Sequence, residues 1–518
     1  MSHSSEHDAP SSQASTDEGD EAPDYADRIL KGGGSVFSGS LIAKAVGFAL
    51  QVVLGRGFGK TLYGLYSYGL SVLRIVRELS TLGLQNGVVR FGAEHREDGN
   101  EAALKGTFLA VGGLGTGAGV LMGGALYLAA PWLSEVALRS TNDPLVFQLF
   151  GTALPFYVFT YLGSRMARAL GQMRVDVLLD SILQPALFLL LTGIILLLGQ
   201  GFTVALYAFL ASTVLAAGAS VYAAYRLFPP LFSSLAPTVD LRTLLRFSLP
   251  IVGVSLASIG LARADRIMLG PLAGEEAVGL YTAASKMSVQ LRFVLFALTA
   301  AFSPVISELY HSGRTDELAQ LYADTVRWIA LGTLPLAVVL IVFAPDIMAL
   351  FGTEFREGAL LLRVLAGAYI VVAGSGSVGH MLQMSDHQDF AFWVNASMAV
   401  LNVGLNWILI QWYGVVGAAL ATGAAHVLGN VFQLWGLYHF THIQPFRWNL
   451  WKPLAAAGAS GAVAWVLFAQ LASLSRWLVG IPVALLVYGG VLLALGLSPR
   501  DQAIADDLWA ELRTRLGA

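Results

Sequence analysis

Residues 54–66 read LGRGFGKTLYGLY, and residues 269–281 read LGPLAGEEAVGLY. At a fixed offset of 215, Leu54, Gly55, Gly59, Gly64, Leu65 and Tyr66 match Leu269, Gly270, Gly274, Gly279, Leu280 and Tyr281. Each stretch lies between two apolar segments, at the start of what would be a set of six helices. Because six is an even number, the two sets would share one orientation, as parallel repeats do, with a binding site at their interface.

The composition around this repeat indicates a membrane protein. Of the 518 residues, 56% are hydrophobic and only 13% are charged, whereas soluble proteins carry about 25% charged residues. The chain contains no Cys, which excludes disulfides, Cys-ligated metals and thiol nucleophiles. It also lacks a Walker A loop and an HExxH pair, so the sequence predicts no enzyme activity, no cofactor and no metal site.

Spanning a bilayer as a helix takes about 20 mostly apolar residues. The sequence predicts an all-α polytopic protein with about fourteen such spans. Their approximate ranges are 34–55, 62–85, 105–130, 145–166, 177–198, 203–226, 245–269, 277–303, 325–344, 358–382, 390–411, 415–438, 453–472 and 477–497.

The basic residues predict the orientation, because Lys and Arg gather in cytoplasmic loops. With the N-terminus inside, 18 of the 31 basic residues fall at inner positions and five in outer loops. We therefore expect a multi-pass protein of the cell membrane with both termini in the cytoplasm.

The same arguments divide the chain into six parts. Residues 1–27 hold eight acids and no Lys or Arg, which favours a disordered acidic cytoplasmic tail. The expected parts are this tail at 1–33, a first lobe at 34–226, a cytoplasmic linker at 227–244, a second lobe at 245–440, an extra helix pair at 441–497 and a cytoplasmic amphipathic helix at 498–518.

Charged residues inside the predicted spans mark the candidate site, because each costs roughly 3 kcal/mol or more if it faces lipid. Eight basic residues remain in the spans, against three acids. Lys44 and Lys286 lie roughly 16 and 14 Å deep at 1.5 Å per residue, too deep to reach the interface easily. Arg77 and Arg292 are equivalent at the offset of 215. Facing arginines need an anion between them, and a phosphate fits the planar guanidinium fork.

The sequence offers secondary candidates with weaker support. Arg74 and Glu78 form an i,i+4 pair that is either structural or part of a cavity. Asp265 can neutralise one of Arg263 and Arg266, and the position of these two arginines near the outer end of their span favours a structural role. Asn402 and Asn406 share one helix face, where they make either interhelical hydrogen bonds or sugar contacts. Tyr66 and Tyr281 fit membrane-interface anchoring better than sugar stacking. The secondary cavity candidates are Arg74, Glu78, Asp265, Arg266, Asn402 and Asn406.

Four stretches together carry a resemblance to a known family: LGRGFGKTLYGLYSYGLSVLRIVRELSTLGLQNGVVRF at 54–91, ARADRIMLGPLAGEEAVGLYTAASKM at 262–287, ALFGTEFREGALLLRVLA at 349–366 and LNVGLNWILIQWYGVVGAALAT at 401–422. The chain resembles the multidrug/oligosaccharidyl-lipid/polysaccharide exporter superfamily, in its oligosaccharide (O-antigen type) flippase branch. This resemblance implies two MATE-like six-helix lobes around a central cavity plus a helix pair.

It also implies a function: moving a glycan on a polyprenyl monophosphate or diphosphate from the inner to the outer leaflet by alternating access. On this reading Lys44, Arg77, Lys286 and Arg292 bind the phosphate. The expected partners are the bilayer, a coupling ion (H⁺ or Na⁺) and a glycan polymerase or glycosyltransferases of the same pathway, with no nucleic acid. A cation-coupled drug exporter of the same fold is the alternative, but it needs intramembrane acids, which are few here.

Overall fold

The computed structural model describes residues 22–138 and 144–496, and within these ranges the chain forms helices and no strand. The helices are α1 (Ala22–Thr81), α2 (Leu84–Glu97), α3 (Glu101–Leu138), α4 (Leu145–Ala169), α5 (Met173–Val177), α6 (Gln184–Leu197), α7 (Phe202–Leu227), α8 (Leu241–Ser288), α9 (Arg292–His311), α10 (Thr315–Val342), α11 (Ala344–Met348), α12 (Ala359–Gly374), α13 (Val378–Met384), α14 (Gln388–Tyr413), α15 (Val415–Thr441), α16 (Trp451–Gln470), α17 (Ser473–Ser475) and α18 (Ile481–Ala494). Short π turns cover Leu178–Leu183 (η1) and Arg476–Gly480, and short 3₁₀ turns cover Pro229–Phe232, Val289–Leu291, Ala349–Phe351, Thr353–Gly358 (η5) and Trp448–Leu450.

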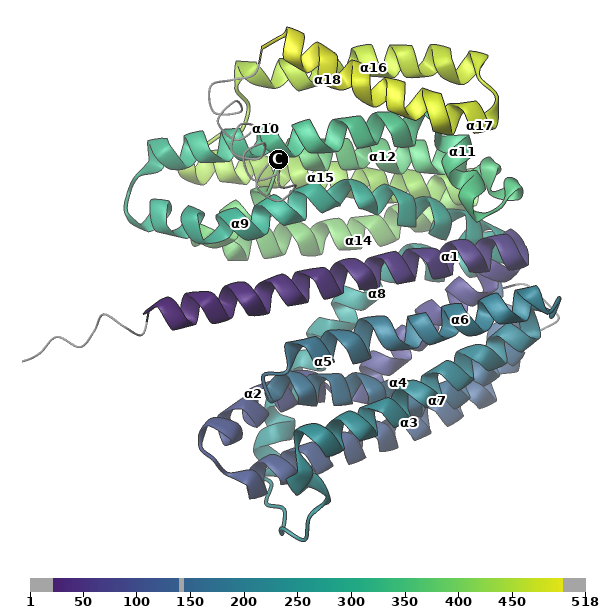
Figure 1. The fold of residues 1–518 in the computed structure, drawn as a ribbon, viewed down its shortest axis with the longest axis vertical. Coiled ribbons are helices and arrows are strands. Elements are labelled where there is room, and N and C mark those ends of the chain that lie inside the picture. The colour runs from purple at the N-terminus through teal and green to yellow at the C-terminus, as the bar shows by residue number, and fades with distance from the viewer. Residues whose placement is uncertain (1–21, 139–143, 497–518) are drawn as a thin grey trace, which may run out of the picture.

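The helices form two bundles with α1 along their boundary. Figure 1 shows α2–α7 on one side and α9–α18 on the other, with α1 between them and α8 running behind it. Large apolar side chains point outward, including Leu121, Leu128 and Leu197, which are 72%, 80% and 89% exposed. Such a broad apolar surface is suited to lipid and not to water. The expected all-α polytopic membrane fold is confirmed.

The expected number of fourteen spans is not confirmed. In the described residues, eleven helical stretches are long and apolar enough to cross a membrane. One of them, Gly39–Thr81, contains two of the spans expected from the sequence, with the non-helical residue Gly59 between them. The helix α8 likewise joins two expected spans and is not among the eleven.

The two kinks are the structural form of the sequence repeat. Gly59 in α1 has φ 79° and ψ 172°, and Gly274 in α8 has φ 84° and ψ 173°. A residue with a Cβ rarely adopts this backbone conformation, so glycine is required at both positions. The offset of 215 therefore relates two long helices with the same break at the same place.

The two kinked helices pack against each other through a second glycine pair. A Cβ on Gly64 would lie 1.8 Å from the backbone oxygen of Glu275, and a Cβ on Gly279 would lie 2.1 Å from that of Lys60. Lys60 and Glu275 are themselves 215 positions apart, so the two contacts are images of each other. The halves therefore meet here in a two-fold-like crossing that only glycine permits.

Ion pairs surround this crossing. The Lys60 ammonium lies 2.7 Å from carboxylate oxygens of Glu276 and Glu357, and its backbone N–H donates to Glu354 Oε1 at 2.7 Å. Lys60 belongs to α1, whereas the three acids belong to α8 and η5. These contacts link the two halves of the chain directly.

The remaining expected parts compare with the structure as follows. Of the expected tail at 1–33, residues 1–21 lie outside the described residues, and α1 already begins at Ala22. In the expected linker at 227–244, Thr238 donates its backbone N–H to Ala102 O at 3.0 Å. The expected amphipathic helix at 498–518 lies outside the described residues.

The start of α8 is capped at the end of this linker. Asp240 accepts hydrogen bonds from the Thr243 hydroxyl at 2.6 Å and from its backbone N–H at 3.0 Å. These bonds hold the pKa of the Asp240 carboxyl below its usual range, because they favour the charged form. The cap satisfies one of the donors that every helix start leaves open.

The extra helix pair packs on the second bundle. Ala456 of α16 and Tyr488 of α18 form a small apolar core with Ala330 and Leu334 of α10. The Tyr488 hydroxyl also donates to Leu331 O at 3.1 Å. The pair is therefore a peripheral addition to the second bundle and lies away from α1.

Candidate functional site

Five cations from both halves gather between α1 and α8. On α8, Lys286 and Arg263 each lie within the electrostatic field of Arg74 and Arg266, and Arg263 also lies within that of Arg77. We call Arg74, Arg77, Arg263, Arg266 and Lys286 the basic cluster. Neighbouring positive charges repel one another, and this repulsion is costly within a membrane. Such a cluster is favourable when an anionic group lies among its members.

Two arginines of the cluster, and Arg292 beside it, keep hydrogen-bond donors that are not used within the described residues. In the part of the chain that the structure describes, the buried Nε atoms of Arg74, Arg77 and Arg292 have no hydrogen-bond partner. Buried donors normally have an acceptor, and a buried group without one calls for a ligand or another explanation. Lys286 is an exposed side chain despite its predicted depth. The geometry leaves both charge and hydrogen-bond donors for a ligand.

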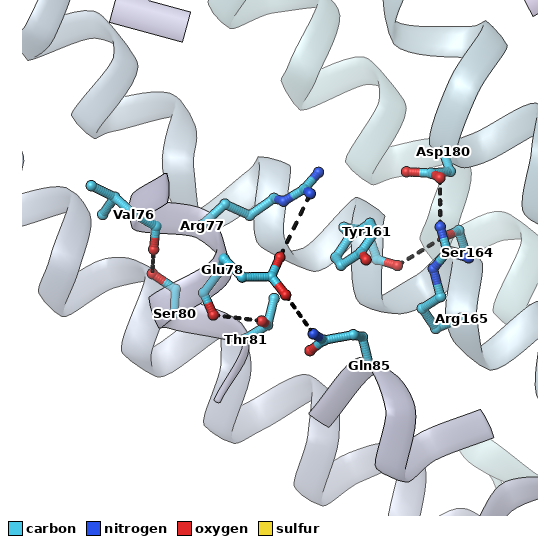
Figure 2. Close-up of polar contacts among 10 residues, drawn as sticks. All are labelled: Val76, Arg77, Glu78, Ser80, Thr81, Gln85, Tyr161, Ser164, Arg165 and Asp180. Atoms are coloured by element: carbon cyan, nitrogen blue, oxygen red, sulfur yellow. Dashed lines mark hydrogen bonds and ion pairs between the residues drawn. The ribbon is translucent and has the colours of Figure 1, made fainter. Parts of the chain in front are cut away.

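One acid partly neutralises the cluster. Glu78 is 4% exposed, lies 3.9 Å from the Arg77 guanidinium and accepts a 2.7 Å hydrogen bond from Gln85. Figure 2 shows both contacts, with the Glu78 carboxylate joined to Arg77 on one side and to Gln85 on the other. The guanidinium of Arg77 also stacks on Tyr161 of α4, 4.0 Å from the ring centre. Glu78 thus turns to Arg77 and Gln85, and Arg74 keeps its charge for the cluster.

A cavity of about 640 Å³ lies beside the cluster, within the second half. Helices α8, α9 and α12–α15 enclose it, and four of the sequence-predicted residues line it: Asp265, Arg266, Arg292 and Asn402. This volume falls within the roughly 300–1,000 Å³ typical of ligand pockets. The cavity can therefore accept a polar group that extends from the basic cluster.

The wall nearest Asp265 is held by a hydrogen-bond network. The Asp265 carboxylate accepts from Tyr281 Oη at 2.6 Å and from Asn406 Nδ2 at 2.8 Å. Asn406 is fully buried and also bonds the Asn402 side chain at 3.1 Å, while Tyr281 contacts Thr422 at 3.0 Å. Asn402 and Asn406 thus make the interhelical bonds that the sequence suggested. The network fixes α8 against α14 and α15.

The repeat-related arginines do not face each other. Arg77 lines a small cavity of the first half with Tyr161 and Asp180, whereas Arg292 lines the large cavity of the second half. Arg292 lies 4.8 Å from the ring centre of Phe296, so each guanidinium stacks on an aromatic ring of its own half. Attraction between the cation and the ring face accounts for this rotation away from the axis.

Lys44 reaches towards the second half. Its ammonium lies 5.0 Å from the ring centre of Phe293 on α9, and the side chain is exposed. The four phosphate-site candidates from the sequence are therefore split. Lys286 belongs to the basic cluster with Arg77, Arg292 lines the adjacent cavity, and Lys44 lies at the α1–α9 boundary.

Sequence reasoning undervalued one residue of the cluster and misjudged two tyrosines. Arg263 seemed structural, although its i,i+3 spacing to Arg266 repeats the spacing of Arg74 and Arg77 and could have signalled a shared face. Tyr66 and Tyr281 are 3% and 2% exposed, so the expected interface anchoring is wrong. Tyr66 packs among Phe150, Phe188 and Phe209 in the core of the first bundle.

Comparison with known proteins agrees with this architecture. The model of the polysaccharide biosynthesis protein family matches residues 29–310, more than half of the chain. The chain belongs to this family. A second model, MatE, matches residues 250–408. Both matches agree with the resemblance to the multidrug/oligosaccharidyl-lipid/polysaccharide exporter superfamily.

Curated relatives are partial matches. The probable low-salt glycan biosynthesis flippase Agl15 of Haloferax volcanii is 26% identical over 204 residues, 39% of this chain and 43% of Agl15. The probable flippase AglR of the same organism is 25% identical over 253 residues, 46% of this chain and 51% of AglR. The probable multidrug resistance protein NorM of Neisseria meningitidis serogroup A is 24% identical over 257 residues, 48% of this chain and 52% of NorM. The chain spans about half the length of each of these three relatives.

Two solved structures share the fold. The lipid II flippase MurJ, in an inward closed conformation, aligns with 88% of this chain and 97% of its own, with a TM-score of 0.67 and 12% identity. An inward-facing multidrug resistance MATE family transporter aligns with 77% of this chain and 95% of its own, with a TM-score of 0.64 and 18% identity. At these identities the likeness concerns the fold alone.

Proposed function

We propose that this flippase moves a glycan carried on a polyprenyl monophosphate or diphosphate from the inner to the outer leaflet of the cell membrane. The observation that carries the proposal is the basic cluster, whose five cations come from both halves. Two of them, Arg74 and Arg77, keep a buried Nε without a hydrogen-bond partner among the described residues. Guanidinium groups bind phosphate oxygens through two parallel hydrogen bonds. The phosphate would lie among the cations while the lipid tail stays in the bilayer.

The two-fold-like arrangement supports alternating access as the mechanism. The halves meet at the glycine crossing of α1 and α8, and rigid movement of one half against the other would open the site to each side in turn. Because a phosphate bound between the halves would contact both, it would favour conformations that keep the halves together. The strong bias of basic residues supports cytoplasmic termini.

The expected partners follow from this role. We propose that glycosyltransferases or a glycan polymerase of the same pathway supply and consume the substrate, and that H⁺ or Na⁺ couples transport to an ion gradient. The protein would act as a transporter and not as an enzyme. The similarities to Agl15, a probable glycan biosynthesis flippase, and to AglR, a probable flippase, support this assignment.

Complementation tests the proposal. The full chain should restore surface glycan in a strain that lacks its own O-antigen-type flippase. Arg74→Ala with Lys286→Ala, and Arg77→Ala with Arg292→Ala, should each abolish the glycan at normal protein level. Arg314→Ala is the matched control, because Arg314 lies on the surface paired with Glu317. Wild-type glycan with both double variants would overturn the phosphate assignment.

A cation-coupled drug exporter is the second candidate, favoured by the NorM match and the MATE fold. It would lower intracellular accumulation of cationic drugs in an efflux-deficient strain. We expect no such change, because the basic cluster repels cations. Reduced drug accumulation without glycan rescue would favour the exporter.

A further inference from the structure

Four primary amides line the part of the large cavity that the phosphate proposal does not use. They come from three helices: Gln383 from α13, Asn395 from α14, and Asn430 and Gln433 from α15. We call these four residues the amide wall. Together they present a neutral surface that donates and accepts hydrogen bonds.

Hydrogen bonds hold this wall in place. Gln433 Nε2 donates to Asn395 Oδ1 at 2.9 Å. Asn430 Oδ1 accepts from the Ser375 hydroxyl at 2.8 Å, and Asn430 Nδ2 donates to His426 O at 2.9 Å. Each amide has two N–H donors and one carbonyl acceptor, more than these bonds use in the described part of the chain. Three of the four amides are therefore held by hydrogen bonds, and the wall retains capacity for a ligand.

Few charged side chains line the cavity, and most of them are engaged elsewhere. Among its described lining residues, the side chains with a permanent charge are Asp265, Arg266 and Arg292. Asp265 is engaged in its network, and Arg266 belongs to the basic cluster. Arg292 therefore stands alone at the cavity, stacked on the half-exposed ring of Phe296. An acidic ligand at the amide wall would find no dedicated cation, since Arg292 also serves the phosphate.

We propose that the amide wall binds the sugars next to the lipid phosphate, and that these sugars are uncharged, such as a hexose or an N-acetylhexosamine. Hydroxyl and acetamido groups both donate and accept hydrogen bonds, which matches primary amides. The cavity volume of about 640 Å³ admits a few sugars only, so the rest of a longer glycan would lie outside it. This inference rests on the proposed function, because the phosphate site sets where the first sugar begins.

Binding to the purified full-length protein tests this inference with three synthetic probes. They are a short-chain polyprenyl diphosphate, the same lipid carrying N-acetylglucosamine, and the same lipid carrying glucuronic acid. Because a net hydrogen bond changes affinity by roughly twofold to tenfold, we expect at least tenfold tighter binding of the neutral glycolipid than of the bare lipid. The acidic glycolipid should bind no more tightly than the bare lipid.

Two variants locate the effect. Asn395→Leu with Gln433→Leu replaces a bonded pair by apolar side chains, which often leaves stability nearly unchanged. It should bring the two affinities to within about twofold while the bare lipid binds as before. Gln383→Leu changes an exposed side chain and should reduce the preference roughly threefold. Gln411→Leu is the matched control, because this exposed amide of α14 bonds Trp407 O outside the cavity.

The possible outcomes distinguish failure of the neutral-sugar site from failure of the proposed phosphate site. If the bare lipid fails to bind wild-type protein, the phosphate proposal falls. If the bare lipid binds and N-acetylglucosamine adds nothing, or if glucuronic acid binds more tightly, only the neutral-sugar site is overturned. An unchanged preference in both amide variants would also overturn it.

Discussion

Replacing Gly64 by alanine should separate the two halves of the protein at their crossing. The added Cβ would lie 1.8 Å from Glu275 O, where ordinary contacts begin near 3.4 Å. The atom it meets is backbone, so no side-chain rotation relieves the overlap. The helices α1 and α8 must therefore move apart by about 1.6 Å, from 1.8 to 3.4 Å, or rotate.

The cost follows from the general penalty for overpacking. Forcing extra methyl groups into a packed interior costs about 1–3 kcal/mol, and more where the backbone must shift. We expect at least about 3 kcal/mol for Gly64→Ala, at the upper end of that range. Gly279→Ala should cost a similar amount, since its Cβ would lie 2.1 Å from Lys60 O.

Thermal unfolding of the detergent-purified full chain measures this effect. Gly47→Ala on the same helix is the matched control, because nothing lies within 4 Å of its Cβ. It should be neutral or stabilise the protein by up to about 1 kcal/mol, the helix-propensity gain of alanine over glycine. Equal stability of Gly64→Ala and Gly47→Ala would refute the close crossing.

Three further predictions follow from individual contacts. Lys60→Gln removes two partly exposed ion pairs and should weaken the contact between the halves by about 0.5–2 kcal/mol. Spin labels on single introduced cysteines should show the halves farther apart in the variant than in wild type at low salt, with little difference between the two proteins at 1 M salt. Asp265→Asn and Asn406→Ala should each lower the free energy of unfolding by about 1–3 kcal/mol. The double variant should lose less than the sum of the two single losses. Strict additivity would mean that the two residues do not interact. Asp240 has a lowered pKa in the folded protein. Its contribution to stability is therefore present above the unfolded pKa near 3.9 and is lost as the pH falls through the lower folded pKa. Hydrogen exchange at the Thr243 amide should be faster in Asp240→Ala than in wild type at pH 7, and an unchanged rate would contradict the cap.

The repeat motif predicted more of the architecture than any other part of the sequence. Glycine identity reports directly on the backbone, because only glycine tolerates the kinks at Gly59 and Gly274 or the crossing at Gly64 and Gly279. The matches at an offset of 215 therefore carried real geometric information. Hydropathy could not reveal the break at Gly59, because the break depends on backbone conformation and not on side-chain polarity.

Composition and charge placement determined the class of protein and the sign of its candidate ligand, because burying a charge in a membrane is costly wherever it occurs. Tertiary structure decided which cations meet. Arg77 and Arg292 are equivalent in sequence, yet each turns towards an aromatic ring of its own half, while Arg263 joins the basic cluster. The bond between Asp265 and Asn406 crosses 141 positions. Helix rotation and the neighbours of each side chain decide such contacts, and neither is encoded in local spacing.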